Sequence, residues 1–159
     1  MRSTLRMLVA VTSILTVLSP AIAGSASSAR SGPADLATVE QYLYRTPISS
    51  FVAAAPSGDR WFDWSNDGCS APLVGNTGRS FNFTAACKRH DFGYRNLKLL
   101  ERRYGSGRTY WNATSRLRVD RQFLSDMRRH CTDRPWYDEP TCNSWALTFY
   151  GVVRVVGGP

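Results

Sequence analysis

Two long helical segments, residues 83–104 and 114–131, constrain the fold of this chain most strongly, because each carries one titratable side chain on its apolar face. Steps of three and four residues place His90 on the apolar face of the first segment and Asp120 on that of the second. The two faces consist of Phe83, Cys87, His90, Tyr94 and Leu97, and of Leu117, Asp120, Leu124, Met127 and Cys131.

A buried carboxylate without a partner is costly, and this cost predicts how the two segments are arranged. If the helices are antiparallel neighbours, Asp120 can accept a hydrogen bond from His90, and both polar groups are satisfied. The alternative is that Asp120 caps a nearby backbone group or tilts towards solvent. A His that is held by a carboxylate through one ring nitrogen can act as a general base through the other.

The remaining pattern predicts a mostly α, small, disulfide-stapled domain. Residues 34–44 and 141–155 have helical spacing, and Thr114 is the expected N-cap of the second long helix. Prolines and glycines interrupt residues 46–82, so this stretch is expected to form loops with one short helical turn. Residues 132–140 are expected to form a second loop.

Residues 1–23 have the features of a secretory signal peptide. They begin with arginines, continue with the short apolar stretch Met7–Leu18 and end on the small-x-small sequence Ala21-Ile22-Ala23. A second run of small residues just downstream leaves the cleavage site uncertain by several positions. We therefore expect a secreted protein, with residues 24–34 as a flexible segment before a single domain over residues 35–159.

Export favours disulfides as the state of the four cysteines. They are Cys69, Cys87, Cys131 and Cys142. The close C-x-x-C pair of a typical zinc site is absent from the sequence, so two disulfides are expected instead. Four cysteines allow three connectivities, and spacing alone does not choose among them.

The chain is basic, with 20 Lys+Arg against 12 Asp+Glu and a formal net charge of +8. All but two of the basic residues, Lys88 and Lys98, are arginines, whose planar forks suit phosphate groups in lipids or nucleic acids. An ordinary solvated surface explains the charge equally well. Because the sequence contains no zinc finger, helix-turn-helix or RNP-like motif, no nucleic-acid partner is expected.

A hydrolytic reaction that uses His90 would need water as its nucleophile, because the sequence lacks a G-x-S-x-G elbow and no cysteine is expected to be free. Asp91, about 100° further round the helix, points off the apolar face towards the preceding loop. That loop offers Asp63, Asn66, Asp67 and Gly68. Hard oxygen ligands of this kind suit calcium better than zinc, although such residues also occur in ordinary loops with local caps.

These residues lie in specific strings. Cys87-Lys-Arg-His90-Asp91-Phe-Gly-Tyr94-Arg-Asn96 is preceded by Phe62-Asp-Trp64-Ser-Asn-Asp67-Gly-Cys69 and followed by Arg118-Val119-Asp120 and Cys142-Asn143. Together they resemble the secreted prokaryotic phospholipase A2 family of bacteria and fungi over roughly residues 61–150. The resemblance implies hydrolysis of the sn-2 ester of glycerophospholipids, with release of a fatty acid and a lysophospholipid.

The resemblance also implies roles for individual residues. His90 would be the base and Asp120 its partner, while Ca2+ would be bound by the carboxylates of Asp67 and Asp91 and the carbonyl of Gly68. The implied disulfides are Cys69–Cys87 and Cys131–Cys142. The implied partner is a phospholipid membrane or micelle interface, and a monomer is expected.

Two departures from the family pattern concern the loop and the helix connection. Gly68 replaces a bulkier residue, and the connection Leu99–Ala113 is longer than usual and rich in arginine and aromatic residues. Two rival functions remain at this level. One is a non-catalytic membrane-binding or toxin-like protein of the same fold, and the other is a secreted calcium-dependent nuclease.

Overall fold

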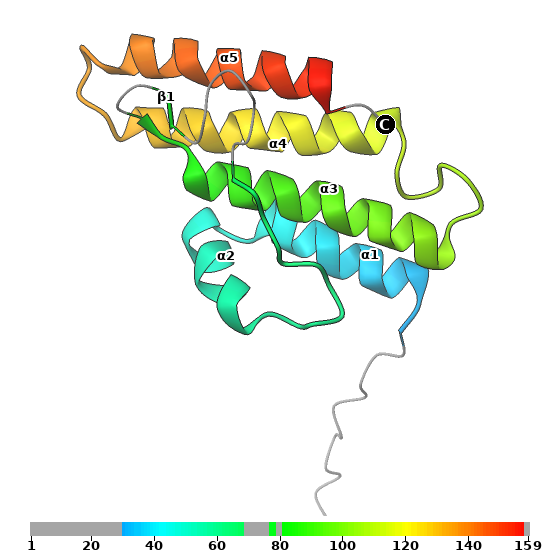
Figure 1. Ribbon diagram of the computed structural model, residues 1–159. Helices are drawn as coiled ribbons and strands as arrows, with labels where there is room; N and C mark the ends of the chain where they lie inside the picture. The colour runs from blue at the N-terminus through cyan, green and yellow to red at the C-terminus, as the bar shows by residue number, and fades with distance from the viewer. Residues whose placement is uncertain (1–29, 69–76, 79–80, 158–159) are drawn as a thin grey trace, which may run out of the picture.

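The computed structural model describes residues 30–68, 77–78 and 81–157. In this part of the chain, long helices lie side by side, with α5 (Glu139–Val156) against α4 (Ala113–Thr132) and α4 against α3 (Thr84–Tyr104) (Figure 1). Helices α1 (Gly32–Glu40) and α2 (Ile48–Ala54) cover the other side of α3. The mostly α fold predicted from the sequence is confirmed. None of the described helices is both long enough and apolar enough to cross a membrane.

Helix α1 begins earlier than the sequence suggested, inside the segment 24–34 that was expected to be flexible. The Ser31 hydroxyl accepts a hydrogen bond from the N–H of Ala34 at 3.3 Å, and Pro33 follows in the first turn. A side-chain cap and an early proline both stabilise a helix start. The expected signal peptide, residues 1–23, lies outside the described residues.

The stretch 46–82 contains more regular structure than the one helical turn expected. Within it, α2 is extended by the 3-10 turn η2 (Ala55–Ser57), while the π-helix η1 (Gln41–Arg45) continues α1 just before this stretch. Two short strands, β1 (Thr77–Gly78) and β2 (Phe81–Asn82), pair antiparallel just before α3. Two-residue strands are too short for an alternating pattern to indicate them.

The start of α4 also differs from the sequence expectation, because Asn112 and not Thr114 is the N-cap. The Asn112 side chain accepts hydrogen bonds from the N–H groups of Thr114 and Ser115, both at 3.0 Å. The Ser115 hydroxyl in turn accepts one from the N–H of Asn112 at 2.9 Å. This reciprocal capping box, with the additional bond from Thr114, satisfies three backbone N–H groups at the start of α4.

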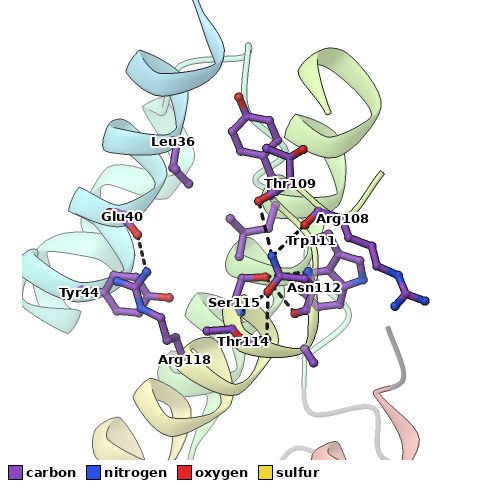
Figure 2. A pocket seen from close by; sticks show the side chains of 13 residues that line it. Leu36, Glu40, Tyr44, Arg108, Thr109, Trp111, Asn112, Thr114, Ser115 and Arg118 are labelled. Carbon is purple, nitrogen blue, oxygen red and sulfur yellow. Dashed lines mark hydrogen bonds and ion pairs between the residues drawn. The ribbon is translucent and has the colours of Figure 1, made fainter. Parts of the chain in front are cut away.

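The connection between α3 and α4 is folded around Glu101 of α3. Its carboxylate accepts hydrogen bonds from the N–H groups of Gly107 at 3.0 Å, Tyr110 at 2.6 Å and Trp111 at 3.1 Å. A hollow of about 550 Å³ lies between this connection and the α1–η1 segment, with the Glu40–Arg118 ion pair on one side (Figure 2). His90 and Asp120 do not line this hollow.

Two apolar clusters form the core of the described residues. One is built from β2, the first half of α3, the second half of α4 and α5, and the other from α1, η1, α2, the second half of α3 and the start of α4. The α4 face is shifted slightly from the predicted one, because Val119 and Phe123 are buried while Leu117 and Leu124 are only half-buried. His90 and Asp120 therefore lie along α3 and α4 where the two clusters meet.

Gly93 lies at the contact between α3 and α4. A Cβ atom at this position would be 2.8 Å from a methyl carbon of Val119 and 2.9 Å from one of Leu43. Such distances are shorter than ordinary van der Waals contacts, so only glycine lets the two helices approach this closely.

Candidate active site

His90 on α3 and Asp120 on α4 face each other across the contact between the two helices. The Nε2 atom of His90 lies 2.8 Å from Oδ1 of Asp120, which is fully buried. The imidazole is 9% exposed and packs against the rings of Tyr94 and Phe123, with centroid separations of 4.3 and 4.8 Å. Since Asp120 holds Nε2, and no described residue is hydrogen-bonded to Nδ1, the second nitrogen remains for proton transfer.

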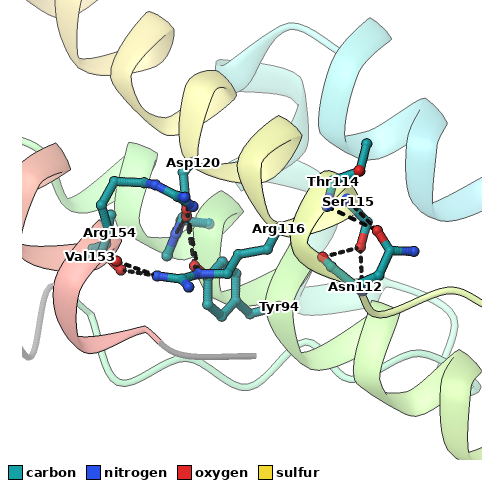
Figure 3. Close-up of polar contacts among 9 residues, drawn as sticks. Tyr94, Asn112, Thr114, Ser115, Arg116, Asp120, Val153 and Arg154 are labelled. Atoms are coloured by element: carbon teal, nitrogen blue, oxygen red, sulfur yellow. Dashed lines mark hydrogen bonds and ion pairs between the residues drawn. The ribbon is translucent and has the colours of Figure 1, made fainter. Parts of the chain in front are cut away.

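Asp120 has further polar partners on three helices (Figure 3). The Tyr94 hydroxyl donates to Oδ1 at 2.7 Å, and the Arg154 guanidinium, from α5, donates to Oδ2 at 2.6 Å. Arg116, one turn earlier on α4, lies 3.7 Å from Oδ2 and also donates to the carbonyl of Val153 at 3.0 Å. The carboxylate is thus fixed by contacts to α3, α4 and α5.

These contacts decide the charge of Asp120. Burial alone would raise the pKa of Asp120, but the hydrogen bonds from His90, Arg154 and Tyr94 outweigh it and hold that pKa below the ordinary value. Burial and the bond to Asp120 raise the pKa of Tyr94, so its hydroxyl stays protonated and donates. At neutral pH Asp120 is therefore an ionised acceptor for the imidazole N–H.

Arg89, the residue before His90, makes a second cross-helix pair that the sequence did not indicate. Its guanidinium donates to both oxygens of Asp126 on α4, with Nε 2.8 Å from Oδ2, and to the carbonyl of Thr46 at 2.6 Å. Gln122 donates to the same carboxylate at 2.9 Å. Both side chains are buried and every oxygen of the carboxylate is occupied, which is the arrangement of a structural ion pair.

Asp91 points off the apolar face of α3 towards the loop that carries Asp67 and Gly68. Its Oδ2 accepts a hydrogen bond from the N–H of Asp67 at 3.1 Å. Burial, followed by the neighbouring Asp67 carboxylate, raises the pKa of Asp91 to about 7. Gly68 has a φ of 70°, a conformation that glycine adopts without strain. The structure thus brings all three expected ligand residues to one place.

Asn96 ties this loop to α3. Its side-chain amide donates to the carbonyl of Asp63 at 2.8 Å and accepts from the N–H of the same residue at 2.8 Å. Asn96 is fully buried, so this two-way bond is shielded from water. Because α3 also carries His90 and Asp91, one helix positions both the imidazole and the loop beside it.

The donor set at this loop fits calcium better than a transition metal. Within the described ranges, no three His, Cys, Asp or Glu side chains lie close enough together to hold a metal ion. A cation here would therefore rely on the carboxylates of Asp67 and Asp91, backbone carbonyl oxygens and water. Calcium accepts such oxygen ligands, and its charge would relieve the repulsion between the two carboxylates.

One disulfide lies wholly within the described residues. Cys131 at the end of α4 is bonded to Cys142 in α5, with Cα atoms 5.6 Å apart. Cys87 on α3 is also disulfide-bonded. Its expected partner, Cys69, lies outside the described residues.

Sequence reasoning placed Tyr94 on the face of His90 but did not predict that it, Arg116 and Arg154 surround the Asp120 carboxylate. Tyr94 and Arg116 could have been found, because each lies one helical turn from a dyad residue on the same face. Arg154 gives no such signal, since it depends on how α5 packs against α4. Asp126 carries the signal of a second carboxylate on the inner face of α4, but its pairing with Arg89 was not predicted.

Comparisons with known proteins agree with the family resemblance of the sequence segments around Asp67, His90 and Asp120. Residues 39–157 match the family described as prokaryotic phospholipase A2. The chain is 34% identical over 120 residues to a secretory phospholipase A2 of Beauveria bassiana, a match covering 75% of this chain and 57% of that protein. It is 28% identical over 148 residues to a secretory phospholipase A2 of Arthroderma benhamiae, covering 91% and 93%. The chain thus spans less than two thirds of the Beauveria protein but nearly all of the Arthroderma protein.

Proposed function

Because this chain belongs to the prokaryotic phospholipase A2 family, we propose that it is a secreted, calcium-dependent enzyme that hydrolyses the sn-2 ester of glycerophospholipids. The observation that carries the proposal is the 2.8 Å contact between His90 and Asp120. It is joined by the contact of Asp91, the residue after His90, with the backbone N–H of Asp67 in the adjoining loop. The secretory names of both relatives and the signal-like residues 1–23 support export.

In the proposed mechanism, His90 acts as the general base. Its Nδ1 accepts a proton from water as the water oxygen attacks the ester carbonyl, and the imidazolium then donates a proton to the leaving alcohol. Asp120 accepts the Nε2–H bond throughout, which orients the ring and stabilises its charged form. No side-chain nucleophile is needed, so no acyl-enzyme is expected.

Asp67 and Asp91 would bind calcium with the carbonyl of Gly68. When bound, calcium supplies a Lewis acid that holds the lipid phosphate and stabilises the oxyanion of the ester. The chain's own contribution is to place this loop beside His90, which it does through the bond between Asn96 and Asp63.

The proposal is tested by measuring fatty-acid release from phospholipid vesicles with calcium or with a chelator, alongside calcium binding by calorimetry. Asp67→Asn and Asp91→Asn are each expected to weaken calcium binding by about tenfold or more, because each removes a charged ligand. Asp63→Asn is the matched control, since the Asp63 carboxylate lies in the same loop but accepts from Ser65 at 2.9 Å.

Several results would contradict the proposal. Full activity in chelator would remove the role of calcium, and unchanged calcium binding in either variant would remove that residue as a ligand. Wild-type protein that binds vesicles without releasing fatty acid would favour the non-catalytic membrane-binding alternative. Activity on nucleic acid in place of lipid would favour the nuclease.

A further inference from the structure

The connection between α3 and α4 carries one buried aromatic side chain, Trp111 (Figure 2). Trp111 is only 8% exposed, and its backbone N–H donates to the Glu101 carboxylate at 3.1 Å. The ammonium group of Lys98, on α3, lies 4.9 Å from the centroid of the indole, which is a cation–π contact. Helix α3 therefore holds Trp111 twice, once through its backbone and once through its ring.

The indole of Trp111 packs on the ring of Tyr94. The two centroids are 4.7 Å apart and the ring planes are inclined at 63°, the edge-to-face arrangement that aromatic pairs favour. No described residue accepts a hydrogen bond from the buried indole N–H, so among the described residues the indole is placed by its ring contacts. Because the indole is buried, we expect it to influence the reaction through its neighbour and not by touching substrate.

Tyr94 links the indole to the dyad (Figure 3). Its ring packs against the imidazole of His90, with centroids 4.3 Å apart. Its hydroxyl donates at 2.7 Å to Oδ1 of Asp120, the same oxygen that lies 2.8 Å from Nε2 of His90. The other oxygen, Oδ2, faces the guanidinium groups of Arg154 and Arg116. If the phenol moved away, the carboxylate could turn towards these cations and carry Oδ1 away from His90.

Tyr94 is only half-buried, so its hydrogen bond to Asp120 needs cover from water. A hydrogen bond is stronger where water is excluded, because water competes for both partners. We propose that Trp111 is a positioning residue, which packs on Tyr94, holds the phenol hydroxyl on Asp120 and so keeps Oδ1 against His90. The proposal rests on the function proposed above, because it requires His90 as the base.

The neighbouring Tyr110 provides a matched control. Its N–H is also bound by Glu101, at 2.6 Å, and it lines the same hollow as Trp111. Its ring, however, meets Tyr104, with centroids 6.5 Å apart, and not Tyr94. A role of the connection in packing or of the hollow in binding would therefore involve both residues, whereas a role through Tyr94 involves Trp111 alone.

The test measures kcat and KM with calcium on a short-chain phospholipid dispersed below its micellar concentration, and circular dichroism checks the fold. Trp111→Ala is expected to lower kcat about tenfold, the effect of losing one hydrogen bond, with KM nearly unchanged. Trp111→Phe keeps a ring on Tyr94 and should restore most of the kcat. Tyr110→Ala should lower stability and leave kcat close to the wild type.

A double-mutant cycle tests whether Trp111 acts through the Tyr94 hydroxyl. Tyr94→Phe keeps the ring and removes the hydroxyl, so Trp111→Ala should lower kcat little further in that background. Glu101→Gln is a second route to the same result if Trp111→Ala does not fold. It loosens the connection that holds Trp111, because an amide has one acceptor oxygen where the carboxylate has two. It should lower kcat by a smaller factor, and only while the Tyr94 hydroxyl is present.

Four results would overturn the positioning role. They are a wild-type kcat in Trp111→Ala, an equal loss in Tyr110→Ala, a full tenfold loss that persists in the Tyr94→Phe background, and a rise in KM with kcat unchanged. His90→Ala separates this proposal from the proposed function. Turnover by His90→Ala would contradict both, whereas an inactive His90→Ala beside a fully active Trp111→Ala would contradict the positioning role alone.

Discussion

Consecutive residues of α3 reach carboxylates on α4 in two quite different ways. The Arg89 guanidinium donates through Nε and Nη2 to the two oxygens of Asp126 and through Nη1 to the carbonyl of Thr46. Both oxygens of the Asp126 carboxylate therefore accept hydrogen bonds, one of them also from Gln122. His90 uses only one ring nitrogen on Asp120, while the other partners of Asp120 come from Tyr94 and Arg154. The first arrangement joins helices, and the second holds a carboxylate firmly while keeping one nitrogen available. The variants below test this difference, from the largest expected effect to the smallest.

The largest effect is expected for His90→Ala. Loss of His90 should lower hydrolysis by more than the roughly 10²–10⁴-fold that one general-base step typically contributes, because the same imidazole is also proposed to donate the proton to the leaving alcohol. Calcium binding should persist, because the imidazole is not one of the expected ligands. Fatty-acid release measures the first effect and calorimetry the second, and a variant that still turns over would contradict the role of His90.

Asp120→Asn is expected to be milder, with a loss of about 10²–10⁴-fold in kcat. An amide can still hold the imidazole in place, but it cannot stabilise the positive charge that the ring gains in the transition state. Circular dichroism should show helix content close to the wild type. A kcat within a few fold of the wild type would mean that the charge of Asp120 beside His90 does not contribute to the reaction.

Asp126→Asn should show the reverse pattern, a loss of stability with activity retained. Breaking a buried ion pair by removing one partner destabilises a protein by about 3–5 kcal/mol, because the remaining charge is left uncompensated. Urea unfolding should therefore report a lower free energy of unfolding, while kcat per folded molecule stays within a few fold of the wild type. A selective loss of kcat would mean that Asp126 contributes to catalysis, as Asp120 is expected to do, and not only to stability.

Arg154→Gln is expected to lower turnover by about tenfold, less than either dyad variant, because its side chain is one-third exposed and the hydrogen bond is partly screened. Arg154→Lys should restore most of the activity, since an ammonium group can replace the charge beside Asp120. Equal losses in both variants would indicate that Arg154 acts only through the packing of α5.

Arg154→Gln should also make the protein less stable in acid. The lowered pKa of Asp120 means that its ionised form stabilises the fold above the ordinary carboxyl pKa, and that this stability is lost as pH falls through the lowered value. Without Arg154 the pKa of Asp120 rises, so acid unfolding should begin at a higher pH. An unchanged acid transition would show that the guanidinium does not stabilise the carboxylate.

Much of this arrangement was predictable from the sequence, because it follows from periodicity along single helices. The spacing of His90 and Asp120 on apolar faces and the position of Asp91 towards the loop needed only the geometry of an α-helix. The mostly α fold and the family resemblance were confirmed. The roles of the site residues themselves stay predictions.

What the sequence could not predict depends on contacts between distant segments. Arg154 reaches Asp120 only because α5 packs on α4, and Asn96 holds the loop only because Asp63 lies beside it. The hairpin of β1 and β2 is too short for periodicity, and the Asn112 cap required a choice between two polar residues that are two positions apart. Local pattern identifies an element more readily than it identifies the partner of a side chain.

The close approach at Gly93 links the spacing of two helices to the rate of a reaction. Gly93 follows His90 by one turn of α3, and the Val119 side chain that it meets precedes Asp120 on α4. A methyl group added at this position would lie 2.8 Å from Val119, so the helices would have to move apart, and the hydrogen bond across the same contact would lengthen with them. The absence of a Cβ atom at residue 93 therefore permits the helix spacing on which the hydrogen bond between His90 and Asp120 depends.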